Sequence, residues 1–235
     1  MGSMRPAPAK TALPQMRPEL RGKFEMKAFV GRLSACIVAS AGVLLTACAG
    51  LGAPPRPTAF YDLGLVDSVS LPASVIPAQV EVSAPSWLDA STMQYRLAWN
   101  PAQRRRSYSE SRWVAQPSEM LASTIERGLR GGPSGGGSSC RLVLELDEFV
   151  QTFESASVSS AGLVLRASWM PVRGGVPLAR REFRLSRATP SADAEGGVIA
   201  YRELARQLNS MLADWLVALD RDGPQGLNTE GRCGP

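Results

Sequence analysis

The strongest constraint on the fold is a long amphipathic segment near the C-terminal end of the chain. Its apolar side chains recur every three or four residues, at Val198, Tyr201, Leu204, Ala205, Leu208, Met211, Leu212, Trp215, Leu216 and Leu219. Polar side chains fall off this stripe, at Arg202, Glu203, Arg206, Asn209 and Asp214. The spacing predicts a long α-helix with one continuous apolar face, which must pack against another layer of structure.

Segments of alternating or β-branched residues predict strands at 60–65, 78–83, 93–99, about 107–114, 141–149, 162–172 and 178–185. A second helix is predicted over 117–129, because Pro117 suits a first turn and apolar residues then recur at helical spacing. The glycine-rich residues 131–139 predict a flexible loop, and Arg173-Gly174-Gly175 predicts a hairpin turn.

This order of strands, helix, strands and helix indicates the fold class. We predict an α+β two-layer domain of mainly antiparallel sheet with two helices packed on it. The two halves also suggest a rough pseudo-repeat of strands followed by a helix.

The N-terminal part has the pattern of an export signal. Met26-Lys27 opens a basic segment, and residues 33–47 (LSACIVASAGVLLTA) are apolar or small. This stretch is too short to span a bilayer comfortably and is typical of a secretory signal peptide. Residues 1–25 are interpreted as an extension upstream of the true start, so that the signal occupies 26–47.

The signal ends in Leu45-Thr46-Ala47-Cys48, which resembles the lipobox of bacterial lipoproteins. The resemblance implies cleavage between Ala47 and Cys48 and attachment of acyl chains to Cys48. The alternative is a cysteine that follows an apolar stretch by chance. Ala49 rather than Asp after the lipidated cysteine implies sorting to the outer membrane, with the domain on its periplasmic face. The proline-rich residues 48–59 are predicted to be a tether, 60–222 the domain, and 223–235 a flexible tail.

The formal net charge of +5 does not indicate nucleic-acid binding. Seven of the 26 basic and two of the 21 acidic residues precede position 48, which leaves 19 of each and no net charge in the mature chain. Proteins that bind phosphate backbones need a positive surplus, so no nucleic-acid partner is expected.

Two cysteines remain in the mature domain, Cys140 and Cys233. In an oxidising periplasm they form either a disulfide or two separate thiols. The chain has no His, and no Lys after Lys27, so it lacks the residues of a Ser-His-Asp triad, a Ser-Lys dyad or a Schiff base. The adjacent Asp147 and Glu148 are predicted to point to opposite faces of a strand. We therefore expect no enzymatic activity, no metal site and no cofactor beyond the acyl chains on Cys48.

The basic run Arg104-Arg105-Arg106 has two interpretations. It contacts an acidic partner or a phospholipid headgroup, or it is the solvated tip of a hairpin, which we favour.

Short motifs behind the lipobox, taken in order, resemble the ABC-type transport auxiliary lipoprotein family. They are Phe60-Tyr61-Asp62-Leu63, Ala84-Pro85-Ser86-Trp87-Leu88-Asp89, Met93-Gln94-Tyr95-Arg96, Tyr108, Arg112-Trp113, Pro117, the strand ending in Asp147 and Phe149, and Trp215-Leu216. The resemblance covers nearly all of residues 48–220.

The resemblance implies a non-catalytic accessory protein of envelope phospholipid transport. In such systems an inner-membrane ABC permease and ATPase are joined to a mammalian-cell-entry (MCE) domain protein that bridges the periplasm. The lipoprotein would dock this MCE-domain protein, and it would form a homo-oligomer. It also suggests Tyr95, Arg96, Arg112 and Trp113 as a partner interface. The alternative is an outer-membrane or cell-wall maintenance lipoprotein that binds peptidoglycan or an assembly machine.

Overall fold

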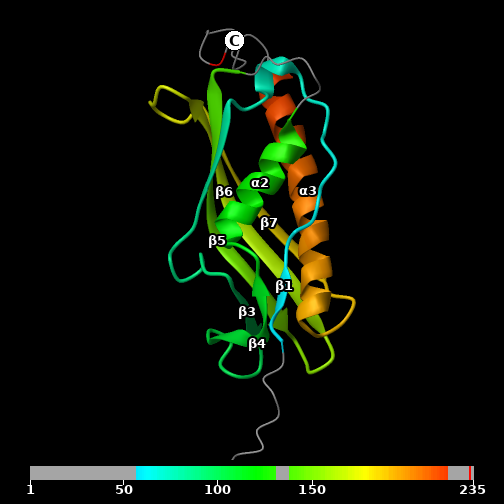
Figure 1. Cartoon of the computed structure of the whole chain (residues 1–235). Helices are drawn as coiled ribbons and strands as arrows, with labels where there is room; N and C mark the ends of the chain where they lie inside the picture. Colours follow the sequence, from blue (N-terminus) through cyan, green and yellow to red (C-terminus); the bar gives the residue numbers. More distant parts are fainter. Residues whose placement is uncertain (1–56, 131–137, 222–232, 234–235) are drawn as a thin grey trace, which may run out of the picture. The chain divides into compact units, whose positions relative to one another are not determined.

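The computed structural model describes residues 57–130, 138–221 and 233 (Figure 1). In chain order the elements are β1 (Ala59–Tyr61), the 3-10 turn η1 (Ala73–Val75), β2 (Gln79–Ser83), β3 (Thr92–Leu97), β4 (Arg105–Trp113), α2 (Pro117–Leu129), β5 (Cys140–Phe153), β6 (Ser159–Pro171), β7 (Ala179–Ala188) and α3 (Ala194–Arg221). Every predicted helix and strand is present; the helix 117–129 has the predicted bounds, and the ends of the other elements are shifted. The predicted signal, most of the tether and nearly all of the tail lie outside the described residues.

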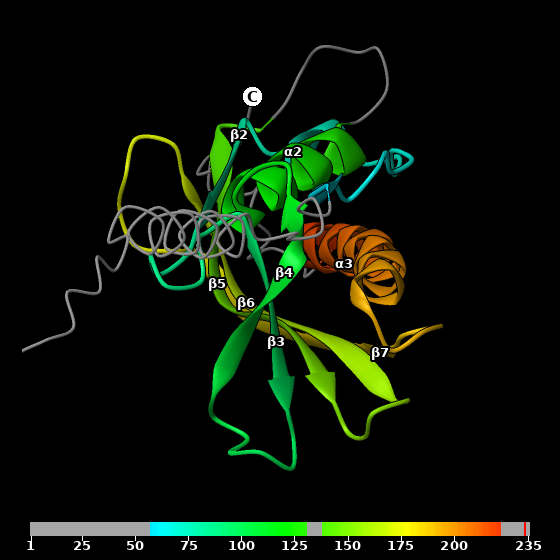
Figure 2. The ribbon, with the colours of Figure 1, turned by 60° about the horizontal axis from the view of Figure 1, so that its bottom comes forward.

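The strands form a seven-stranded sheet in the order β1-β4-β3-β5-β6-β7, with β2 paired to β5. Strand β5 is central, because β6 runs antiparallel along one of its edges while β2 and β3 pair in parallel with its two ends. Figure 2 shows α2 and α3 on one side of this sheet.

The α+β class and the two packed helices are confirmed. The sheet is mixed but mainly antiparallel, as predicted, because its two longest strand pairings, β5–β6 and β6–β7, are both antiparallel. The β3–β4, β5–β6 and β6–β7 pairs are antiparallel, whereas β1–β4, β2–β5 and β3–β5 are parallel. The strands-then-helix order occurs twice, as predicted, but whether the two halves are structurally equivalent stays a prediction.

Helix α3 buries its apolar stripe against β6 and β7, and it also contacts α2. One residue departs from the prediction. Asn209 is only 2% exposed and lies against Gly128 of α2. Only a glycine leaves room for it there, because a Cβ added to Gly128 would come within 2.6 Å of the Asn209 amide. The Nδ2 group of Asn209 donates hydrogen bonds to the carbonyls of Ala205 and Thr124. The contact with a second helix therefore buries a polar residue that lies beside the stripe of α3.

The alternation of buried and exposed residues along strand β5 shifts by one residue midway along the strand. Leu142, Leu144 and Leu146 are buried, and a bulge between Leu146 and Glu148 then shifts the register against β6. After the bulge the buried positions include Phe149 and Phe153. The extra residue lets one strand serve two parts of the core, with leucines at one end and aromatic rings at the other.

Strand β7 forms one edge of the described sheet. Its buried residues are Phe183 and Leu185, and it carries four exposed arginines, Arg180, Arg181, Arg184 and Arg187. The turn before it contains Gly174 and Gly175 with φ of 86° and 121°, which glycine adopts without strain. The predicted hairpin turn is therefore confirmed.

Candidate functional site

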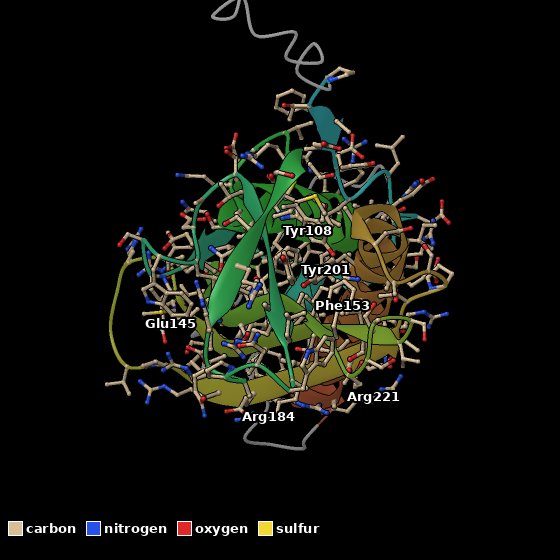
Figure 3. The ribbon with its side chains drawn as sticks, turned by 90° about the horizontal axis from the view of Figure 1, so that it is seen from below. Tyr108, Glu145, Phe153, Arg184, Tyr201 and Arg221 are labelled. Carbon is tan, nitrogen blue, oxygen red and sulfur yellow. A yellow bond between two sulfur atoms is a disulfide. The ribbon has the colours of Figure 1, made fainter. Side chains whose placement is uncertain are left out.

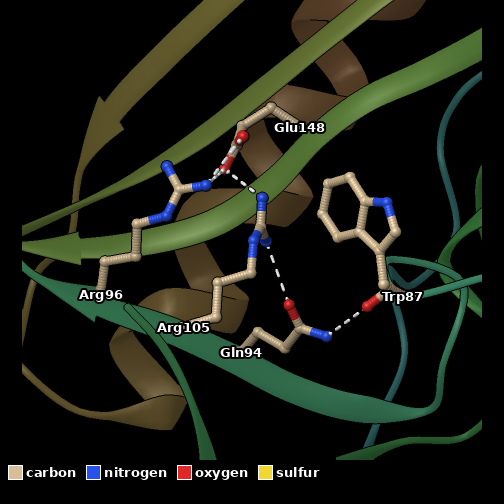
Figure 4. A network of polar contacts seen from close by, with 5 residues as sticks. All are labelled: Trp87, Gln94, Arg96, Arg105 and Glu148. Carbon is tan, nitrogen blue, oxygen red and sulfur yellow. Dashed lines mark hydrogen bonds and ion pairs between the residues drawn. The ribbon is translucent and has the colours of Figure 1, made fainter. Parts of the chain in front are cut away.

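A half-buried ion-pair network joins the three strands β3, β4 and β5 (Figure 4). Glu148 of β5 accepts hydrogen bonds from Arg96 of β3 at 3.2 Å and from Arg105 of β4 at 2.9 Å. The three side chains are between 18% and 27% exposed. Hairpin pairing sets Arg96 opposite Arg105, and the parallel pairing of β3 with β5 brings both near Glu148.

The same network fixes an exposed tryptophan. Arg105 donates to Gln94 Oε1 at 3.0 Å, and Gln94 donates to the carbonyl of Trp87 at 2.9 Å. The Arg105 guanidinium also lies 4.5 Å from the centre of the Trp87 ring, which is a cation–π contact. The Trp87 side chain remains 53% exposed. We call Trp87, Gln94, Arg96, Arg105 and Glu148 the tryptophan–arginine network.

The segment that carries Trp87 is held in place by the two residues that follow it, Leu88 and Asp89. Leu88 is 2% exposed in the core, and its backbone N–H donates to the carbonyl of Pro85. The carboxylate of Asp89 accepts from the backbone N–H of Ser118 at 3.2 Å and from its hydroxyl at 2.6 Å, at the start of α2. These contacts place Trp87 on a rigid turn.

The network has two guanidinium groups and one carboxylate. Burial lowers the pKa of Arg105, and the neighbouring Glu148 opposes this shift. Arginine still stays charged at neutral pH because its pKa starts so high. The network therefore presents one excess positive charge beside an aromatic ring, a combination suited to a carboxylate or a carbonyl-rich surface.

An aromatic cluster lies beside the network, because its member Tyr95 stands between Gln94 and Arg96 on β3. Figure 3 labels two other members, Tyr108 and Phe153. The ring of Tyr95 lies 4.8 Å from that of Tyr108 and 5.5 Å from that of Phe153. The Tyr108 hydroxyl donates to Gln151 Oε1 at 3.0 Å. Burial raises the pKa of Tyr108 and that of Tyr201. Both phenols therefore stay neutral and act as packing and hydrogen-bonding groups.

The structure divides the predicted interface residues. Arg96 belongs to the network, and Tyr95 is half-buried in the aromatic cluster. The guanidinium of Arg112 donates to the backbone carbonyls of Tyr108 and Ser111. Trp113 is 2% exposed, with its ring 5.5 Å from that of Phe149. The prediction of Trp113 as an interface residue is therefore wrong, because its side chain is buried in the core and cannot contact a partner.

Sequence reasoning missed Trp87, Gln94, Arg105 and Glu148 as a unit. The arginine run was favoured as a solvated hairpin tip, but Arg105 and Arg106 belong to β4 and are half-buried. The signal that could have found it is Glu148, which falls where the alternating leucines at 142, 144 and 146 lead one to expect another apolar residue, together with arginines on two other strands. Which strands are neighbours cannot be seen in that pattern.

Cys140 and Cys233 form a disulfide with their Cα atoms 5.1 Å apart, which is one of the two alternatives that the sequence left open. Ala47 and Cys48 lie outside the described residues. Within the described ranges, no group of three or more His, Cys, Asp or Glu side chains is placed to hold a metal ion. Those ranges also contain no helix long and apolar enough to cross a membrane.

No family model and no curated protein matches the sequence. Among solved structures, protein XCC0632 from Xanthomonas campestris, described under the family model DUF330, has a TM-score of 0.59 and 17% identity over 70% of this chain and 98% of its own. A second, uncharacterized protein has a TM-score of 0.50 and 12% identity over 68% and 99% of the two chains. These likenesses show a shared fold. The TM-score of 0.24 to lipoprotein GNA1162 from Neisseria meningitidis, at 10% identity over 60% and 99% of the two chains, is too low to support one.

Proposed function

We propose that this chain is a non-catalytic lipoprotein of the outer membrane. It would serve as an auxiliary component of an ABC/MCE-type phospholipid transport system and would dock the MCE-domain protein. Acyl chains on Cys48 would hold it at the periplasmic face, and identical copies would assemble. The observation that carries the docking role is Trp87, fixed over Arg105 and still half exposed.

The physical case rests on how binding energy is distributed in protein interfaces. Tryptophan and arginine dominate the residues whose truncation weakens binding most. A side chain already held in one position loses little entropy on binding. The contacts of Arg105 with Glu148 and Gln94 hold its guanidinium in place before a partner arrives. The network is therefore pre-organised, and its excess positive charge favours an acidic surface on the MCE-domain protein.

The proposed compartment has separate support. Disulfides persist in the periplasm and are rare in the cytosol, and Cys140 is bonded to Cys233. The signal and lipobox at residues 26–48 provide the export route and the attachment point.

The test is affinity purification of the tagged full chain from detergent-solubilised membranes of its native host. We expect the wild type to recover an MCE-domain protein together with an ABC permease and ATPase. Trp87→Ala should weaken this recovery, by about 2 kcal/mol or roughly 30-fold in Kd for a residue at the centre of an interface. The matched control is Trp99→Ala, because Trp99 is 55% exposed but lies outside the network.

Each result has a defined meaning. If the wild type recovers no transporter component, the transport role is wrong, and recovery of peptidoglycan or an assembly machine would favour the maintenance role. If Trp87→Ala recovers as much partner as Trp99→Ala, the docking surface lies elsewhere. Equal urea midpoints of the two variants would show that lost binding does not reflect lost folding.

A further inference from the structure

Strand β7 lies at the end of the described sheet and pairs along one side only. Among the strands that the structure describes, its neighbour is β6, and the two keep one register from Ala179 to Ala188. These ten residues contain no proline and no bulge, and strands most commonly have about five or six residues. Three devices that often close a sheet edge, a short strand, a proline and a bulge, are therefore absent from β7.

The register shows which backbone groups of β7 face outward. The N–H of Thr189, directly after the strand, donates to the carbonyl of Ser159 on β6 at 2.9 Å. In an antiparallel pair, successive residues turn their N–H and C=O groups alternately toward the neighbouring strand and away from it. The even-numbered residues from Arg180 to Ala188 therefore point these groups away from β6. Within the described ranges, no other segment forms a backbone hydrogen bond with them.

The side chains along this edge are mostly arginine. Arg180, Arg181, Arg184 and Arg187 are exposed, and the one exposed carboxylate of the strand is Glu182. Glu182 pairs with Arg184, whereas the other three arginines form no ion pair with any described residue. The edge therefore offers three guanidinium groups without a counter-charge, and guanidinium groups bind carboxylates strongly.

The two faces of an added strand would meet different surroundings. Phe183 and Leu185 are buried on the side of the sheet that carries the helices, so the odd-numbered positions belong to that face. Arg180 lies on the opposite face, which α2 and α3 leave open (Figure 2). Directly opposed residues of paired strands lie on the same face. A complementary strand would thus carry apolar residues in its middle and acidic residues toward its ends, opposite Arg181 and Arg187.

We propose that this edge of β7 binds an extended acidic segment of a partner protein, which joins the sheet as an antiparallel strand. Backbone hydrogen bonds hold such a segment, and the side chains of alternate residues select it. The charge of the edge determines which segments qualify, because a basic strand is repelled and an acidic strand is attracted. This site depends neither on the lipid anchor nor on Trp87, so it is separate from the proposed docking role.

The test uses the full chain purified in detergent and a labelled synthetic peptide. The peptide has valine opposite Phe183 and Leu185, glutamate opposite Arg180, Arg181 and Arg187, and threonine elsewhere. Binding is measured by fluorescence anisotropy, and backbone pairing is measured by hydrogen exchange of single amides. We expect the peptide to bind and to slow the exchange of the even-numbered amides of β7, since the odd-numbered amides already bond to β6.

Charge reversal provides the matched comparison. The double variant Arg180→Glu with Arg187→Glu should bind the peptide roughly tenfold more weakly, because two cross-strand attractions become repulsions. It should instead bind a peptide with lysine in place of glutamate. Arg173→Glu changes a charge of the same kind on the exposed turn before β7, outside the paired positions. At physiological salt this control should bind the glutamate peptide as the wild type does.

Each contrary result identifies the step that fails. Failure of the wild type to bind the peptide, or equal binding of a version with glutamine in place of glutamate, would overturn the acidic partner. Binding without protection of the even-numbered amides would overturn strand addition. If the peptide does not bind but Arg180→Glu with Arg187→Glu dissociates an oligomer of the wild type in sedimentation, the edge is an interface between copies of this chain, and the proposal is wrong.

Discussion

Reduction of the Cys140–Cys233 disulfide should destabilise the domain strongly. The bond closes a loop of 93 residues in the sequence. In the chain-entropy model, such a loop removes about 4.6 kcal/mol of conformational freedom from the unfolded chain at 25 °C. This is a large part of the roughly 5–15 kcal/mol by which most domains are stable. With a urea m-value of about 2 kcal/mol/M, the unfolding midpoint should fall by about 2 M on reduction.

The assay is urea unfolding followed by tryptophan fluorescence, on oxidised protein and on protein unfolded and refolded with a phosphine reductant. A thioether at Cys48 would resist the reductant, so the disulfide alone would change. The control is the double variant Cys140→Ala with Cys233→Ala, whose midpoint should not respond to reductant. Coincident midpoints for oxidised and reduced wild type would refute the entropic reasoning for this bond.

Two further predictions concern the core and the pH dependence. Gly197→Ala should cost about 1–3 kcal/mol, because its Cβ would overlap the Oε1 of Gln151, whereas Ile199→Ala on the exposed face of α3 should change the urea midpoint little. Hydrogen bonds from Arg166 hold the pKa of Asp147 below its ordinary value, so the stability that this pair contributes is present above about pH 4 and is lost as pH falls through the lower pKa of the folded state. Thermal unfolding between pH 5 and pH 2, in steps of about one unit, should therefore show a shallower decline for Asp147→Asn than for the wild type, and equal declines would contradict the assignment.

Local patterns predicted the elements of this fold well. The helix 117–129 has the predicted bounds, and the long helix extends beyond the predicted stripe at both ends, to Ala194 and Arg221. Such patterns work because burial of one face imposes a period on the residues of one element. The turn at Gly174 and Gly175 was also visible, since few other residues accept its backbone angles.

The pairing of distant strands could not be predicted in the same way. Strand β2 pairs with β5 about 60 residues later, and alternation within either strand carries no information about its neighbour. The tryptophan–arginine network could not be predicted for the same reason, because its residues meet only through the pairing of distant strands. Glu148 meets Arg96 only because β3 pairs with the end of β5 and a bulge precedes Glu148. Asn209 was placed off the apolar stripe for a related reason, because its burial depends on a glycine in another helix.

The arginines of β7 limit how copies of this protein can meet. An open strand edge normally offers its unpaired amides and carbonyls to any other strand. Here ten residues of edge carry four exposed guanidinium groups and one exposed carboxylate, Glu182, so two such edges repel each other. Even where anchored copies would collide often on a membrane surface, their β7 edges would thus not pair with one another and extend into fibres. Any ring of identical subunits would have to close through contacts other than β7 against β7.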